Sequence, residues 1–246
     1  MPLRVGLEGY WPCHETGADP GDLIDFTAYA SNGVETGGVI PSASGLVVTS
    51  RDLELGSSQF FLVSDPVDGH LDFGNEDFTL SCWVKKESSP ATGMRLVHKG
   101  TSGAAANTPY SLYWDTALNR FGFDVSNGTT QTTRTFASLG TPSNGVWYHL
   151  VAGHDSVGNT VWVRANDAAT DTAAHTAGCF NASVDFRIGS GRTAGGTPQE
   201  FYDGLICEIG VWRKKLSAAE ITYLYNLGAG ITWPLGSAGS QVVWVW

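Results

Sequence analysis

The sequence predicts an all-β protein, a two-sheet antiparallel jelly-roll sandwich with one short helix in its C-terminal region. Apolar and polar residues alternate in several short segments, and this period of two places every second side chain on the same face of a strand. Turn-forming clusters such as Ser-Asn-Gly separate these segments, and the chain has 31 glycines and only 15% charged residues. Short strands punctuated by turns at this rhythm are typical of sandwiches and jelly rolls.

The alternation is clearest in four segments, at residues 78–85, 147–152, 161–165 and 205–212. In the last of them we expect Leu205, Cys207, Ile209 and Val211 on one face and Ile206, Glu208 and Trp212 on the other. Two such apolar faces, one from each sheet, pack into a core about 10 Å thick.

One helix is predicted near the C-terminus. Ser217 and Glu220 have the spacing of a capping box, in which each side chain bonds a backbone N–H of the first turn. Ile221, Leu224 and Tyr225 then form an apolar stripe, and residues 226–228 end the helix. We expect this helix to cover one edge or end of the sandwich.

The chain is expected to form one domain over residues 1–234, followed by a tail at residues 235–246. The tail begins with a Gly/Ser linker and ends in six β-prone residues. Its apolar members are Val242, Val243, Trp244, Val245 and Trp246. An exposed strand of this kind is an aggregation hazard, so we expect it to add to a sheet edge. That edge belongs either to the same sandwich or to a partner.

The net charge of −10 argues against nucleic acids and anionic membranes as partners. It is compatible with divalent cations. No apolar run approaches the roughly 20 residues that span a bilayer, and residues 1–5 lead directly into the first strand, so we expect neither a membrane segment nor a signal peptide.

Several aromatic residues fall on the polar faces of predicted strands. Sugar rings stack on indoles while flanking polar groups bond their hydroxyls. The candidate ligand-binding residues are Trp162, Arg164, His149, Trp83, Trp212 and Glu208. Two other interpretations are open for the tryptophans: cover by a crossing loop or the helix, or burial in an oligomer interface.

Six motifs in order along residues 5–230 resemble the laminin-G-like jelly roll of the concanavalin A-like lectin/glucanase superfamily. They are G-Y-W-P-C-H-E at residues 9–15, L-D-F-G-N-E-D-F-T-L-S-C-W-V-K at 71–85, H-K-G at 98–100, Y-S-L-Y at 110–113, W-Y-H-L-V-A-G at 147–153 and the closing run from Phe201 to Asn226. A looser match, D-F-T-A-Y-A-S-N-G at residues 25–33, is similar to the family's D-x-S-G-N-G-N-x-G turn. The resemblance implies the sandwich fold and a binding function more often than a catalytic one.

The resemblance also implies one structural calcium ion. Asp203 matches the aspartate of the family's closing motif, and Glu15 and Asp25 lie in regions that face it. Carboxylates held by turns suit this hard cation. The chain departs from the family pattern at residues 55–57, which lack the expected aspartate, and at Cys207. The alternative interpretation is purely structural: Asp203 forms a turn before Gly204.

The four cysteines, Cys13, Cys82, Cys179 and Cys207, lack metal-type spacing and are expected to be buried thiols. The resemblance places the strand of Cys13 near the final strand, which leaves a contact between Cys13 and Cys207 open.

Catalytic signatures of the superfamily are missing. Its glucanases carry two glutamates flanking an aspartate in one strand, whereas Glu208 has no carboxylate two or four residues away. No serine lies in a G-x-S-x-G elbow. We therefore expect no enzymatic activity.

The leading hypothesis is a non-catalytic binding or adhesion module that recognises a glycan or cell-surface polysaccharide. Without a signal peptide, a virion surface, as in phage decoration or tail proteins, explains extracellular action best. Two alternatives remain: a purely structural assembly protein with virion or homo-oligomeric partners, and a secreted bacterial polysaccharide-acting enzyme. The fold hosts all three.

Overall fold

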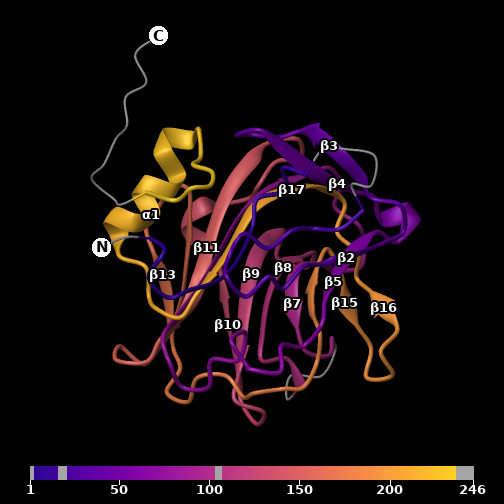
Figure 1. Ribbon diagram of the computed structural model, residues 1–246. Helices are drawn as coiled ribbons and strands as arrows, with labels where there is room; N and C mark the ends of the chain where they lie inside the picture. The colour runs from indigo at the N-terminus through magenta and orange to yellow at the C-terminus, as the bar shows by residue number, and fades with distance from the viewer. Residues whose placement is uncertain (1–2, 16–20, 103–106, 237–246) are drawn as a thin grey trace.

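In the computed structural model, residues 3–15, 21–102 and 107–236 are described, and they form two packed antiparallel β-sheets (Figure 1). The first sheet has eight strands. In spatial order these are β13 (Asp171–Ala174), β12 (Thr160–Ala165), β11 (Trp147–Asp155), β6 (Phe78–Lys86), β17 (Gly204–Trp212), β4 (Thr49–Leu53) and β3 (Ile40–Ser44), with β1 (Leu7–Trp11) paired to β17.

The second sheet has seven strands. In spatial order these are β10 (Gln131–Thr135), β9 (Arg120–Ser126), β8 (Tyr110–Asp115), β7 (Met94–Lys99), β14 (Phe186–Ile188), β5 (Phe60–Val63) and β2 (Val34–Thr36). A small hairpin, β15 (Gly191–Arg192) and β16 (Pro198–Gln199), follows β14. Short 3-10 turns lie at η1 (Leu55–Ser57), η3 (Ala137–Leu139) and η4 (Asn226–Gly228). The predicted all-β sandwich is confirmed.

The core lies between the two sheets and is rich in aromatic rings. Phe78 of β6 stacks on Phe73 with ring centroids 4.6 Å apart, and Tyr110 of β8 lies 5.3 Å from Phe78. Leu80, Cys82 and Val84 face inward as the alternation predicts, together with Leu150 and Ala152 of β11 and Val161 and Val163 of β12.

The predicted face assignment is wrong for the first half of β17. Cys207 pairs with Trp83, whereas Gly210 pairs with Ser81, so three steps on β17 oppose two on β6. This is a β-bulge, and Glu208 adopts a left-handed φ of 52° within it. Ile206 therefore pairs with the inward-facing Val84, and Cys207 shares the outer face with Trp83. An extra residue reverses the side-chain alternation, which a strict period of two cannot anticipate.

Helix α1 (Ala218–Tyr225) begins at the predicted capping box, with Ser217 as N-cap and Glu220 bonding back to it. It covers the outer face of the first sheet rather than an edge or end, and Figure 1 shows it beside β11 and β13. A second apolar cluster lies between α1 and the sheet and includes residues of the helix itself: Leu3, Leu7, Tyr10, Val151, Trp162, Trp212, Leu216, Ile221, Leu224 and Leu235. The first sheet is consequently apolar on both faces, and β6 is buried along nearly its whole length.

All four cysteines are free and buried, as predicted. Burial is the largest cause that raises the pKa of each thiol, and for Cys82 it is the sole cause. Within the described residues, no helix is long and apolar enough to cross a membrane.

Candidate functional site

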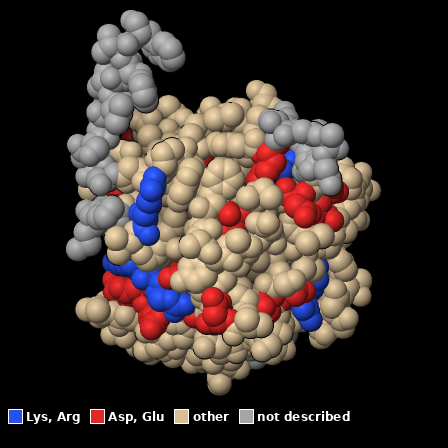
Figure 2. Space-filling model, viewed as in Figure 1, with Lys and Arg blue, Asp and Glu red and all other residues tan. Residues whose placement is uncertain are grey.

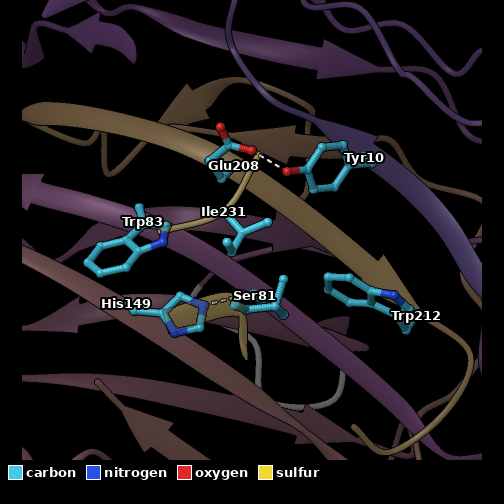
Figure 3. Close-up of a pocket in the computed structure, with 8 residues that line it drawn as sticks. Tyr10, Ser81, Trp83, His149, Glu208, Trp212 and Ile231 are labelled. Atoms are coloured by element: carbon cyan, nitrogen blue, oxygen red, sulfur yellow. Dashed lines mark hydrogen bonds between the residues drawn. The ribbon is translucent and has the colours of Figure 1, made fainter. Parts of the chain in front are cut away.

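A small pocket lies between the outer face of the first sheet and the segment that covers it (Figure 3). Its walls are Tyr10, Ser81, Trp83, His149, Glu208, Trp212, Leu224 and Ile231. Four of the six predicted ligand-binding residues, Trp83, His149, Trp212 and Glu208, thus line one space. Sequence reasoning missed Tyr10, whose strand β1 reaches this face only through pairing with β17.

The pocket is closed by aromatic packing. The Trp83 ring stacks on His149 at 5.0 Å and on Tyr225 of α1 at 5.8 Å, and it is 2% exposed. The Trp212 indole N–H donates to the carbonyl of Leu3 at 2.7 Å. The remaining space admits about one water molecule and no sugar ring.

The polar groups of the pocket bond one another. The Tyr10 hydroxyl donates to Glu208, and His14 Nε2 lies 2.7 Å from the other oxygen of that carboxylate. Burial, followed by the Glu208 charge, raises the pKa of Tyr10. Burial and the Arg164 charge lower the pKa of His149 to about 3, so its ring is neutral at pH 7 and bonds Ser81 at 2.8 Å.

Trp162 and Arg164 lie on β12 beside the pocket without lining it. Trp162 is 1% exposed, with the Lys215 ammonium 6.0 Å from its ring centroid. Arg164 is half-buried opposite Val151. Every predicted tryptophan of this face is therefore covered, and contact with a sugar there requires α1 to move away from the sheet.

The predicted metal ligands do not gather at one point. Both carboxylate oxygens of Asp25 accept hydrogen bonds from its own loop, and Glu15 pairs with Arg51 at 2.9 Å. Asp203 instead accepts from the Leu55 amide at 3.2 Å.

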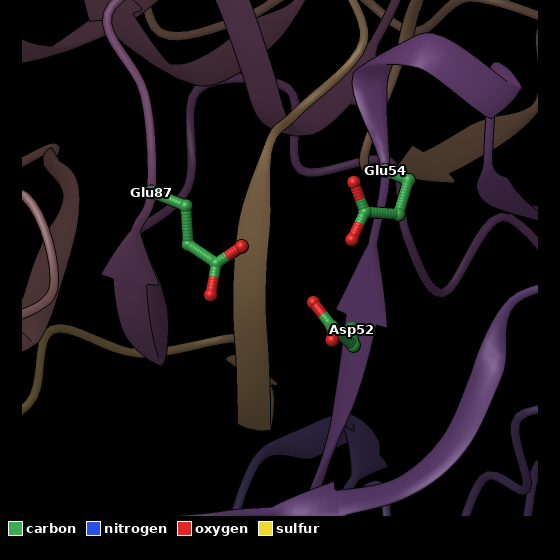
Figure 4. Close-up of side chains that lie close together, drawn as sticks. All are labelled: Asp52, Glu54 and Glu87. Atoms are coloured by element: carbon green, nitrogen blue, oxygen red, sulfur yellow. The ribbon is translucent and has the colours of Figure 1, made fainter.

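A different acidic group forms where β4 and β6 flank β17 (Figure 4). Ligand oxygens of Asp52, Glu54 and Glu87 lie within 4.8 Å of one another. Figure 2 shows acidic side chains gathered near the position of β4 and β17. These oxygen donors suit a hard cation and could hold a metal ion. Asp203 is adjacent, since the Glu87 amide donates to its carbonyl at 3.0 Å.

The electrostatics of this group fit a cation. Burial is the largest cause that raises the pKa of Asp52, with Asp203 adding to it. Burial, then the charges of Asp52 and Glu54, raises the pKa of Glu87. One buried oxygen of Asp52 has no hydrogen-bond partner. Sequence reasoning missed the group because Glu87 is more than 30 positions from Asp52 and Glu54 and meets them only through shared pairing with β17.

The exposed aromatic rings of the described residues both lie in the loop at residues 25–31. Tyr29 is 45% exposed and Phe26 is 37% exposed. One face of the Tyr29 ring stacks on His70 at a centroid distance of 4.0 Å and an angle of 15°. His70 is in turn held by Asp68 at 2.5 Å and by the Ser31 hydroxyl at 3.1 Å.

Asp25 holds this loop rigid. Its carboxylate accepts from the amides of Tyr10, Thr27 and Ser31 and from the Thr27 hydroxyl, at distances of 2.9–3.0 Å. The Asp68–His70–Ser31 relay has the order of groups found in a nucleophilic triad, and the Ser31 amide donates to Asp25. These bonds hold the ring of His70 where it stacks on Tyr29.

The predicted assembly residues of the tail, at positions 242–246, lie outside the described residues.

Comparison with known proteins places these features in context. The sequence model described as the concanavalin A-like lectin/glucanases superfamily matches residues 55–222. A search of curated proteins finds no match to the sequence.

Several solved structures share the fold. Domain 4 of an extracellular arabinanase from Geobacillus stearothermophilus, solved in complex with arabinotriose, has a TM-score of 0.60 and 18% identity, and the match covers 88% of this chain and 96% of that one. The binding domain of Paraclostridial Mosquitocidal Protein 1 has a TM-score of 0.68 and 11% identity over 91% of this chain and 52% of its own. The binding domain of Botulinum neurotoxin DC, in complex with SialylT, has a TM-score of 0.66 and 13% identity over 90% and 51%. This chain spans about half the length of the two toxin chains.

Proposed function

Since the chain belongs to the concanavalin A-like lectin/glucanases superfamily, we propose that it is a non-catalytic module that acts outside cells and binds carbohydrate. The observation that carries this proposal is the exposed, rigid pair of aromatic residues Phe26 and Tyr29. The relatives that were solved with arabinotriose or SialylT support the ligand class.

Tyr29 has the properties of a sugar-stacking platform. One ring face rests on His70, which leaves the other side of this exposed ring to solvent. Because stacking and the Asp25 network already fix the loop, little conformational entropy is lost when a ligand binds. The exposed carboxylate of Asp68 lies beside the platform and can accept hydrogen bonds from sugar hydroxyls.

The test is Tyr29→Ala. We expect a glycan array and titration with neutral oligosaccharides, arabinotriose among them, to show affinity reduced roughly tenfold, the loss typical of one aromatic contact. Leu118→Ala removes a similarly exposed apolar side chain from another turn and is the matched control. Unchanged glycan binding by Tyr29→Ala would contradict the proposed platform. Release of product from any polysaccharide would contradict a non-catalytic role.

We propose a second role for the predicted outer-face residues in a displaced state of α1. Trp162, Trp83 and Trp212 would then offer stacking faces, with Arg164, His149 and Glu208 as polar contacts. The platform at Tyr29 needs no such displacement and is the primary site of the proposal.

We propose calcium as the cation for the acidic group at β4, β6 and β17. Asp52, Glu54 and Glu87 would hold it through carboxylate oxygens, and the neighbouring backbone at Asp203 would be stabilised with them. The bound ion would neutralise the repulsion among the carboxylates and fix this edge of the sheet.

The alternative is a structural protein that assembles through its tail, on a virion surface or in a homo-oligomer. The observation that favours it is the composition of residues 241–246, Gln-Val-Val-Trp-Val-Trp, because such a segment pairs readily with a sheet edge. None of the relatives described above is a virion protein, so the virion context is carried by the sequence argument alone.

A further inference from the structure

Two arginines converge on the outer face of the second sheet with fewer acceptors than they need. Arg187 lies on β14, and Arg192 lies on β15. A terminal nitrogen of each guanidinium lies 3.7 Å from the same oxygen of Asp185. This distance is longer than the 2.7–2.9 Å typical of a charge-assisted hydrogen bond, so one carboxylate is shared weakly between two cations.

The donors left over are buried. Arg187 is 3% exposed, and its Nε and Nη1 have no partner, as is true of Nε of Arg192. The hydroxyl of Ser190 is also buried without a partner. Ser190 lies between the two arginines in sequence. Buried donors without acceptors are costly, which implies that an acceptor occupies this place.

The surroundings are electropositive. His98 pairs with Arg187 across β7 and β14, and burial together with the charges of Arg95, Arg187 and Arg192 lowers its pKa to about 3. Arg95 itself is engaged by Glu200 at 2.9 Å. Arg95 thus has its own carboxylate partner, whereas Arg187 and Arg192 share the single carboxylate of Asp185.

We propose that Arg187 and Arg192, with the hydroxyl of Ser190, form a binding site for an oxyanion, the chemical group shared by free sulfate or phosphate and by the carboxylate or sulfate ester of an acidic sugar. Guanidinium forks match such anions in geometry and charge. The partly exposed side chains of Arg192 and Asp185 connect the site to solvent. This site is separate from the Tyr29 platform and stands without the proposed function.

The test is titration of the full chain with millimolar sodium sulfate at constant ionic strength, followed by calorimetry and thermal unfolding. We expect saturable binding to the wild-type protein. Arg192→Gln should weaken it roughly tenfold or more, because it removes charge-assisted hydrogen bonds. Arg187→Met preserves side-chain volume and should abolish binding while keeping the fold, which circular dichroism checks. Arg120→Gln, an arginine of β9 that bonds the Ala137 carbonyl, is the matched control and should bind as the wild type does.

An equal effect of sulfate on the unfolding temperature of all four proteins would mean a general salt effect and would overturn the proposal. Crystals soaked in selenate that show only water between Arg187 and Arg192 would overturn it as well. Tighter binding of a uronate or sulfated oligosaccharide than of its neutral counterpart, lost in Arg192→Gln, would identify the anion as part of a glycan. Binding of free sulfate without that preference would identify a free anion. The Tyr29→Ala variant should retain sulfate binding, so failure of the platform and failure of this site are distinguishable.

Discussion

At the scale of single residues, the acidic group has the clearest energetic consequence. The pKa values of Asp52 and Glu87 are raised in the fold, because burial and neighbouring carboxylates disfavour their charged forms. A carboxyl group whose folded pKa lies above its unfolded value destabilises the fold at neutral pH, and this destabilisation is relieved as the pH falls through the raised pKa. Asp52 is half-buried and Glu87 is exposed, so solvent screening limits the effect to about 1 kcal/mol or less.

We expect Glu87→Gln to raise the unfolding temperature at pH 7.5 in the absence of divalent cations, because one repelling charge is lost. Calcium should raise the unfolding temperature of the wild-type protein and have little effect on the variant. Differential scanning calorimetry with calcium and with a chelator measures both.

Glu35→Gln removes a half-buried carboxylate of β2 that accepts from the Val39 amide and is the control. It should keep the wild-type calcium response. An identical calcium response in Glu87→Gln would show that the cation binds elsewhere or not at all.

At the scale of elements, α1 covers the outer face of the first sheet and keeps its tryptophans from solvent. Its apolar residues Ile221 and Leu224 pack over Trp162 and Trp212, and Tyr225 stacks on Trp83. A helix of eight residues is too short to be stable alone, so its capping box and this packing hold it in place. Glu220 is part of the capping box through its bonds to Ser217, and it also forms an ion pair with Lys214 at 2.7 Å.

We expect Ser217→Ala to reduce the free energy of unfolding by about 1 kcal/mol, the usual contribution of an N-cap side chain. The loss should be accompanied by faster hydrogen exchange at the amides of α1 and of the segment that covers the pocket. Urea unfolding and exchange mass spectrometry measure the two effects.

Thr222→Ala, an exposed position on the same helix, should leave stability unchanged or slightly increased, because alanine has the higher helix propensity. Equal behaviour of the two variants would mean that packing alone holds α1.

At the scale of the whole molecule, the described residues form one sandwich. The first and the last of them contact each other beside α1. The Arg4 side chain donates to the Leu235 carbonyl at 3.2 Å, and its guanidinium lies 4.8 Å from the Trp233 ring centroid. Leu3 and Leu235 are both buried in the cluster beneath α1. Leu235, the first residue of the predicted tail, therefore packs against the sandwich.

We expect a chain that ends at Gly236 to fold with an unchanged unfolding temperature, because it keeps Leu235. If the tail assembles subunits, the full chain should be an oligomer and the shortened chain a monomer. Native mass spectrometry and light scattering of both chains distinguish these states.

A chain of full length with residues 242–246 replaced by Ser and Gly is the control for length. It should behave as the shortened chain does if the apolar side chains mediate assembly. The same mass per particle in all three proteins would contradict an assembly role and leave the tail a strand of its own sandwich or a dispensable end.

The fold followed from the sequence by itself, because a period of two and frequent turns leave few arrangements other than a sandwich. Capping at Ser217 was equally local and was predicted correctly. Tertiary structure decided the rest. Glu208 reverses the alternation of β17 through a bulge, and α1 buries a face whose polar residues indicated a groove. The acidic group joins residues that are far apart in sequence, whereas Arg187 and Arg192 are close in sequence and only their burial decides which of their donors lack partners. Periodicity reports which side chains share a face, but what covers that face and which strands are neighbours are determined by long-range packing.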